Sequence, residues 1–284
     1  MRIYVLIPLL VVLSGCSKEP ILKYEIKGNT VTITDCDESA LGKLVIPEKI
    51  EGNLVTSIGE KAFQFCESLT SITIPDSVTS IGRSSFYNCT SLTSITIPDG
   101  VTSIESQTFD GCSNLTSIII PDSVTSIGVS TFSGCTNLTS ITIPKSVTSI
   151  GFVAFEECRS LTNISIPDGV VRIKSGTFII CTNLTSITIP DSVTTIMDFA
   201  FENCTSLTSI TIPDSVNTIE NYVFDGCKSL TAVTFLGDAP DAQVSGENPA
   251  PIDGSTPTIY RKPEAKGWGD TWAGRPVKLI SEKP

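Results

Sequence analysis

Residues 68–89 read SLTSITIPDSVTSIGRSSFYNC, and near copies of this stretch follow one another along most of the chain. The final cysteine recurs with a strict period of 23 residues, as Cys66, Cys89, Cys112, Cys135, Cys158, Cys181, Cys204 and Cys227. A fixed period of this length is the signature of a solenoid, in which each coil packs on its neighbours. The sequence therefore predicts a β-rich solenoid of 23-residue coils.

The start of each coil has the spacing of a leucine-rich repeat strand. In Leu69-x-x-Ile72-x-Ile74, successive side chains of a strand alternate between its two faces, so both isoleucines point inward and Thr73 points outward. Pro75 then ends the strand, because proline has no N–H for the ladder. We expect one parallel strand in each coil.

The second half of the coil returns to the core twice. Val78 and Ile81 lie on a short extended segment, and residues 84–86 are predicted to form a single helical or 3₁₀ turn that directs Phe86 inward. The cysteine then fills the small space beside the phenylalanine. Adjacent rungs of the cysteine ladder come within disulfide range, but identical positions in stacked coils point their Cβ atoms in parallel. Buried free thiols are therefore expected, and Cys36, outside the period, is also expected to be free.

Both ends of the array depart from the repeat. Residues 23–58 are expected to form an N-terminal cap, with a hairpin around Gly28-Asn29, and an irregular first repeat with a strand at 44–46. The leucine-rich repeat solenoid follows over 59–235, and 236–284 form a C-terminal loop and β cap. Trp268 and Trp272 are expected to close the open end of the core, the alternative being an aromatic ligand site.

The N-terminus has the pattern of an export signal. Residues 3–13 are an apolar run, too short to span a bilayer, and Leu-Ser-Gly-Cys follows at 13–16. This ending resembles the bacterial lipobox. The resemblance implies a lipoprotein signal peptide over 1–15, cleavage before Cys16, and a diacylglyceryl group on its sulfur, with 16–22 as lipidated cysteine and tether. An ordinary signal peptide with an incidental cysteine is the alternative. We expect export and lipid anchoring at the outer membrane or cell surface of a bacterium.

Composition excludes several functions. The net charge of −11 disfavours nucleic acid as a partner. The chain has no histidine, so a Ser-His-Asp or Cys-His catalytic site cannot be built from it. A zinc site is not expected, because the sequence has no CxxC pairing. We predict no enzymatic activity, no catalytic residue, no cofactor and no metal site.

The outward face of the strands carries two ladders of small hydroxyl groups. Their members are Ser71, Thr73, Ser94, Thr96, Ser140, Thr142, Ser186, Thr188, Ser209 and Thr211. Hydroxyl side chains on such a face commonly pair across strands, and the tryptophan, tyrosine and arginine that dominate protein interfaces are missing from it. The face is a candidate for binding, but a weak one.

The positions after Gly82 and after Phe86 vary from coil to coil and are the better candidates. Apolar residues gather there in the later coils. The candidate partner-binding residues are Phe152, Val153, Ile179, Ile180, Phe199 and Tyr222. Exposed apolar patches mark interaction sites. The alternative is that some of these side chains fill gaps between coils.

A ladder of aspartates follows the prolines, starting at Asp76 and interrupted by Lys145. A calcium ladder is one interpretation, and plain turn residues are the simpler one. Asp76-Ser77-Val78 and its copies at 122, 191 and 214 also resemble the O-glycosylation sequence of Bacteroidetes.

Taken together, the coils resemble the BspA-like, or Treponema-type, leucine-rich repeat family over about 260 residues. The resemblance implies a cell-surface or secreted protein that binds other proteins, host or bacterial, in several cases as an adhesin. We therefore expect a monomeric envelope lipoprotein with a protein partner. A passive envelope-structural protein and a glycan-binding surface component are the alternatives.

Overall fold

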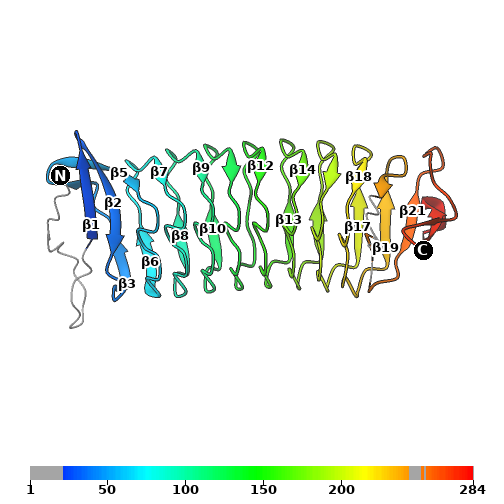
Figure 1. Ribbon diagram of the computed structural model, residues 1–284, viewed down its shortest axis with the longest axis horizontal. Coiled ribbons are helices and arrows are strands. Elements are labelled where there is room, and N and C mark those ends of the chain that lie inside the picture. The colour runs from blue at the N-terminus through cyan, green and yellow to red at the C-terminus, as the bar shows by residue number, and fades with distance from the viewer. Residues whose placement is uncertain (1–21, 243–250, 253, 284) are drawn as a thin grey trace. The chain divides into compact units, whose positions relative to one another are not determined.

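The structure is a computed structural model that describes residues 22–242, 251–252 and 254–283. The predicted signal peptide and Cys16 lie outside the described residues. The chain divides into two compact units, Met1–Pro144 and Lys145–Pro284. Both are built from β coils of the predicted kind (Figure 1).

The first unit begins with a capping sheet and continues into stacked coils. Its strands are β1 (Leu22–Lys27), β2 (Thr30–Cys36), β3 (Leu41–Val45), β4 (Lys49–Ile50), β5 (Asn53–Ile58), β6 (Ser68–Thr73), β7 (Ser80–Ile81), β8 (Ser94–Thr96), β9 (Ser103–Ile104), β10 (Ser117–Ile119) and β11 (Ser126–Ile127). The predicted hairpin is confirmed, since β1 and β2 pair antiparallel and Lys27 faces Thr30. Gly28 between them has φ +63°.

Strands of successive coils pair in parallel and in register. β6 pairs with β8 and β8 with β10, so that Ser71, Ser94 and Ser117 lie side by side. The irregular first repeat joins this ladder through β3, which pairs with β6. A second ladder connects β5 to β7, with Ile58 opposite Ile81. Each of these coils therefore adds a second short strand to the single one expected.

The second unit repeats this arrangement and ends in a cap. Its strands are β12 (Ser149–Ile150), β13 (Asn163–Ser165), β14 (Arg172–Ile173), β15 (Ser186–Thr188), β16 (Thr195–Ile196), β17 (Ser209–Ile212), β18 (Thr218–Ile219), β19 (Ala232–Phe235), β20 (Asp241–Ala242), β21 (Thr258–Arg261), β22 (Thr271–Trp272) and β23 (Arg275–Leu279), followed by the 3₁₀ turn η1 (Ile280–Glu282). β19 pairs in parallel with β21, and β21 with β23, which extends the main ladder beyond the last regular coil.

The tryptophans close this end of the core, as predicted. Trp268 and Trp272 pack against Phe235, with ring centroids 4.9 and 5.1 Å away. Their indole N–H groups donate to the carbonyls of Gly237 and Pro240. Each tryptophan thus covers apolar surface and satisfies its polar atom, as a buried indole requires.

The core consists of vertical columns of identical residues. The phenylalanine rings stack from coil to coil, with centroids 5.4 Å apart for Phe86 and Phe109, and 5.6 Å apart for Phe155 and Phe178. The cysteines, leucines and inward isoleucines form parallel columns, and nearly all are buried. No coil encloses its own apolar face, so each is stabilised by its neighbours.

The thiols of the repeat are buried and free, in agreement with the prediction. Most donate a hydrogen bond to a phenylalanine carbonyl of the preceding coil, as in Cys89 to Phe63 at 3.1 Å and Cys204 to Phe178 at 3.2 Å. Burial raises the pKa of Cys181 and of Cys227 to about 12. They are space-filling groups, protonated at neutral pH.

Candidate interaction surface

The third side of each coil is a segment in which two residues adopt the left-handed conformation. In residues 82–89 these are Ser84, with φ +53°, and Asn88, with φ +56°. The prediction of a helical or 3₁₀ turn here is wrong. Alternate N–H groups leave the coil and donate to the next one, as Phe63 does to the Ser85 carbonyl at 2.7 Å, whereas a helix directs them all along its own segment.

The same two positions are left-handed in coil after coil. The first set is Lys61, Ser84, Gln107 and Ser130 in the first unit and Val153, Gly176, Phe199 and Tyr222 in the second. The second set is Phe65, Asn88, Gly111 and Gly134, then Glu157, Ile180, Asn203 and Gly226. Glycine and asparagine tolerate this conformation, whereas β-branched and bulky residues rarely adopt it. Four of the six candidate partner-binding residues occupy these positions.

One group of the candidates lies around Gly176. A Cβ atom on Gly176 would lie 2.8 Å from Cγ1 of Val153 and 3.5 Å from Cγ2 of Ile179. The glycine therefore makes room for two apolar side chains, Val153 from the preceding coil and Ile179 from its own coil. Phe152, beside Val153 in the chain, is 44 % exposed.

Phe152 also has a cationic neighbour. The Lys174 ammonium lies 5.6 Å from the Phe152 ring centroid, within cation–π range, and donates to the Ser149 hydroxyl at 3.1 Å. Val171, three residues before Lys174 in the same coil, was not singled out in the sequence analysis and is 49 % exposed. Its signal is that the four preceding regular coils have threonine at that position. We call Phe152, Val153, Ile179 and Ile180 the apolar cluster.

Phe199 and Tyr222 form a separate pair. Their rings stack in parallel with centroids 5.2 Å apart, and both side chains are half-buried. Part of their apolar area is therefore used between coils.

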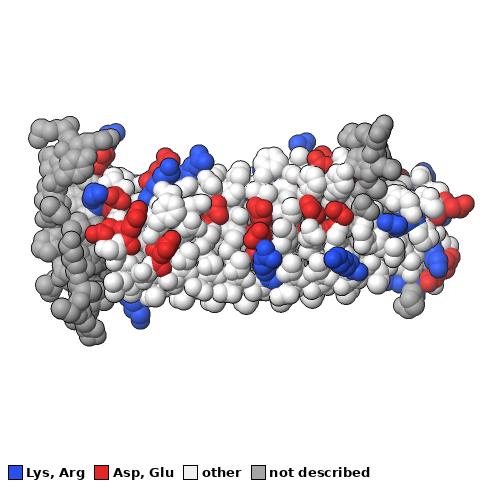
Figure 2. All heavy atoms as spheres, turned by 60° about the horizontal axis from the view of Figure 1, so that its bottom comes forward, with Lys and Arg blue, Asp and Glu red and all other residues white. Residues whose placement is uncertain are grey.

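Carboxylates surround the left-handed segments of the second unit. The Asp198 carboxylate accepts a hydrogen bond from the Asn221 N–H at 2.9 Å, and the Glu220 carboxylate accepts one from the Asp198 N–H at 3.0 Å. Burial, with a contribution from nearby Asp225, raises the pKa of Glu202. Figure 2 shows charged groups scattered over an otherwise uncharged surface.

The strand face keeps its hydroxyl ladders exposed. Of the ten predicted ladder residues, only Ser71 is half-buried. The hydrogen bonds between coils come from a neighbouring column that the sequence analysis missed, in which Thr93 donates to the Thr70 carbonyl at 3.1 Å and Thr185 to the Thr162 carbonyl at 3.0 Å. The predicted ladders are thus available to solvent.

A shallow hollow opens on the strand side of the second unit. Its volume is about 320 Å³, and it is lined by Ile187, Thr188, Ile189, Asp191, Thr211, Pro213 and Leu236. Two ladder threonines and one turn aspartate meet there, a juxtaposition that the sequence analysis did not foresee.

The post-proline turns have a structural role. The Ser77, Ser123, Ser192 and Ser215 hydroxyls each donate to a valine carbonyl of the preceding coil at 2.6–2.7 Å. Glycosylation at these serines would remove a short hydrogen bond. Across the described ranges, no cluster of three or more metal-ligating side chains is present.

The repeat pattern can be matched to known proteins. A family described as "BspA type Leucine rich repeat region" matches residues 38–159 and 148–240 in six copies. The chain belongs to this BspA-type leucine-rich repeat family. Within the described residues, no helix is long and apolar enough to span a membrane.

Solved structures of leucine-rich repeat proteins support the assignment. A T. pallidum leucine-rich repeat protein is 33% identical, covering 66% of this chain and 87% of its own, with a TM-score of 0.62. A leucine-rich repeat protein from Bacteroides ovatus is 30% identical, covering 95% of this chain and 77% of its own, with a TM-score of 0.71. No curated protein matches the sequence. Proteins of the BspA type are generally non-enzymatic binding scaffolds, and nothing in these comparisons points to catalysis.

Proposed function

We propose that this BspA-type protein is an exported lipoprotein that binds a protein partner through its apolar cluster. The observation that carries the proposal is the choice of residue at the left-handed positions. Val153 and Ile180 are β-branched side chains with φ of +48° and +60°, a conformation that costs roughly 1–2 kcal/mol for such residues. Several other coils carry glycine or asparagine at the equivalent positions, and either residue would relieve this cost at Val153 or Ile180.

Exposure supports the same proposal. Phe152 leaves nearly half of its surface in contact with solvent, and aromatic anchors are enriched in protein interfaces. Lys174, over the Phe152 ring, adds a positive charge beside the apolar cluster. A partner surface with an apolar anchor and a single carboxylate facing Lys174 would match both features.

Arrays of host matrix proteins and of glycans test the proposal. We expect the full chain to bind proteins on the first array, and the Phe152→Ser/Ile180→Asn double variant to bind at least tenfold more weakly. The matched control is Thr188→Ala/Thr211→Ala on the strand face, which should bind normally. Normal binding by the double variant, with loss in the strand-face control, would overturn the assignment of the site.

A glycan-binding role is the second candidate, because the hollow places the Thr188 and Thr211 hydroxyls beside Asp191. Such groups hydrogen-bond sugar hydroxyls. Glycan binding that is lost in the strand-face variant would favour this role. No binding on either array would favour a passive envelope-structural protein.

Lipid anchoring is tested separately. Metabolic labelling with an alkyne fatty acid should label the protein, and Cys16→Ser should abolish the label. Protease added to intact cells should remove the protein if it lies on the cell surface. Unlabelled wild-type protein would contradict the anchor.

A further inference from the structure

The first rung of the cysteine ladder differs from the rungs above it. Cys89, Cys112 and Cys135 each donate to a phenylalanine carbonyl at 3.1–3.2 Å. Cys66 has no phenylalanine below it, since the equivalent acceptor position is Ala40. Its thiol reaches only the Asp37 carbonyl, at 3.9 Å.

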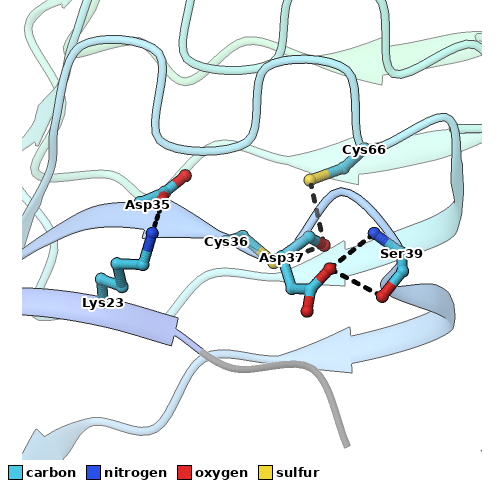
Figure 3. Close-up of polar contacts among 6 residues, drawn as sticks. All are labelled: Lys23, Asp35, Cys36, Asp37, Ser39 and Cys66. Carbon is cyan, nitrogen blue, oxygen red and sulfur yellow. Dashed lines mark hydrogen bonds and ion pairs between the residues drawn. The ribbon is translucent and has the colours of Figure 1, made fainter. Parts of the chain in front are cut away.

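A second thiol converges on the same carbonyl. Cys36, the last residue of β2, is 3 % exposed, and its sulfur lies 3.7 Å from the Asp37 oxygen. Figure 3 shows both thiols directed at Asp37. The neighbouring Cys66 thiol, together with burial, raises the pKa of Cys36.

The surrounding segment holds this arrangement in place. The Asp37 carboxylate accepts hydrogen bonds from the N–H and the hydroxyl of Ser39, at 2.8 and 2.6 Å. Directly before Cys36 on β2, Asp35 forms an ion pair with Lys23 of β1 (Figure 3). The loop that brings Cys36 beside Cys66 is therefore braced on both sides.

We propose that Cys36 and Cys66 form a disulfide when the chain folds in an oxidising compartment. The two S–H bonds break and one S–S bond forms. The two electrons and two protons pass to an external disulfide, which is reduced to two thiols. Exchange takes place during folding, because both sulfurs are buried in the finished structure.

The ladder thiols are poorer candidates for two reasons. Their short bonds to phenylalanine carbonyls would have to break, whereas the contacts of Cys36 and Cys66 to Asp37 are long and weak. Rungs of stacked coils also share one orientation, while Cys36 approaches from β2, an element outside the repeat. The bond would fasten the capping hairpin to the first coil, at an open end of the array where a solenoid frays.

Refolding tests the proposal. The full chain is unfolded and reduced, then refolded with reduced and oxidised glutathione, and the folded fraction is isolated by gel filtration. Remaining thiols are blocked with N-ethylmaleimide at acid pH in denaturant, and the protein is digested with trypsin without reduction. Cleavage after Lys27, Lys43, Lys61, Arg83 and Lys145 separates 28–43, which holds Cys36, from 62–83, which holds Cys66, and from 84–145.

We expect peptides 28–43 and 62–83 to appear linked and to separate on reduction. A link between 62–83 and 84–145 would overturn the proposal, because it would join Cys66 to the ladder. Folded protein with Cys36 and Cys66 both carrying N-ethylmaleimide would also overturn it.

Thermal unfolding gives a second measurement. Reductant should lower the midpoint of the refolded wild type by about 5–10 °C. Cys36→Ser should show no such response, while the matched control Cys112→Ser should keep it. A response that persists in Cys36→Ser would place the disulfide elsewhere.

Discussion

The left-handed positions of the two units share a backbone but differ in chemistry. In the first unit one set carries Lys61, Ser84, Gln107 and Ser130, whereas in the second it carries Val153, Gly176, Phe199 and Tyr222. The φ angles are alike, so the coil geometry does not depend on the side chain present. In the second set of positions the first unit also carries one bulky residue, Phe65, whereas Val153 and Ile180 of the second unit are β-branched. β-Branched residues fit this geometry least well, and we propose that Val153 and Ile180 are retained for partner binding.

The largest expected effect tests whether the cores of the two units are equivalent. Phe109 and Phe178 each stack between two rings at 5.4–5.7 Å. Replacing either by Ala should lower the free energy of unfolding by about 3–5 kcal/mol, because the cavity cannot collapse between fixed coils. Urea unfolding of Phe109→Ala and Phe178→Ala measures this. A loss below about 1 kcal/mol in one unit alone would show that the cores differ.

The loss of stability at alkaline pH is a second property that distinguishes the buried thiols of the core from surface residues. The pKa of Cys181 and of Cys227 is raised from 9.0 to about 12 by burial. Above pH 9 the unfolded chain releases protons that the folded chain retains, so stability is complete below pH 9 and falls as pH rises toward 12. The expected fall is about 1.4 kcal/mol per pH unit for each thiol.

Urea unfolding at pH 8 and pH 10 measures that fall. Cys181→Ala should reduce the slope of the unfolding free energy against pH by the contribution of one thiol. The surface control Ser140→Ala should leave this slope unchanged. An unchanged slope in Cys181→Ala would mean that this thiol does not titrate as its burial requires.

A reciprocal exchange addresses the left-handed positions directly. Ile180→Asn should raise the free energy of unfolding by about 1 kcal/mol, and Asn88→Ile at the equivalent position of the first unit should lower it by about 1–2 kcal/mol. The reason is that asparagine tolerates φ near +60° and isoleucine does not. Thermal and urea unfolding of both variants measure the two effects.

The exchange also separates stability from binding. Ile180→Asn should weaken partner binding while the protein becomes more stable. A variant that is less stable than wild type would instead show that Ile180 is a packing residue.

The smallest expected effect distinguishes hydroxyl groups that donate a hydrogen bond to the preceding coil from hydroxyl groups that are exposed on the strand face. Ser192 donates to the Val170 carbonyl at 2.7 Å, so Ser192→Ala should cost about 1 kcal/mol. Thr188 is exposed on the strand face, and Thr188→Ala should stay within about 0.5 kcal/mol of wild type. Equal costs in urea unfolding would contradict the division between structural and exposed ladders.

Much of the fold could be predicted because every coil repeats the same sequence pattern in the same tertiary surroundings. The place of a residue in the repeat therefore also gives its place in the fold. Ile72 and Phe86 are buried in one coil, and their equivalents are buried in the others apart from the half-buried Ile187, since each meets the same neighbours. The candidate site was only partly predictable. Variation at Phe152 and Ile180 was visible in the sequence, but the contact of Val153 with the space over Gly176 depends on how adjacent coils stack.

The 23-residue period and the alternation within each coil were enough to establish the solenoid, its core columns and its two capped ends, because coils that contact only their neighbours carry no long-range ambiguity. Stacking decided the rest. It placed alternate N–H groups in hydrogen bonds between coils and so imposed left-handed residues where a local turn was expected. It also brought Cys36, which has no place in the period, beside Cys66, because that proximity arises from the capping sheet packing on the first coil.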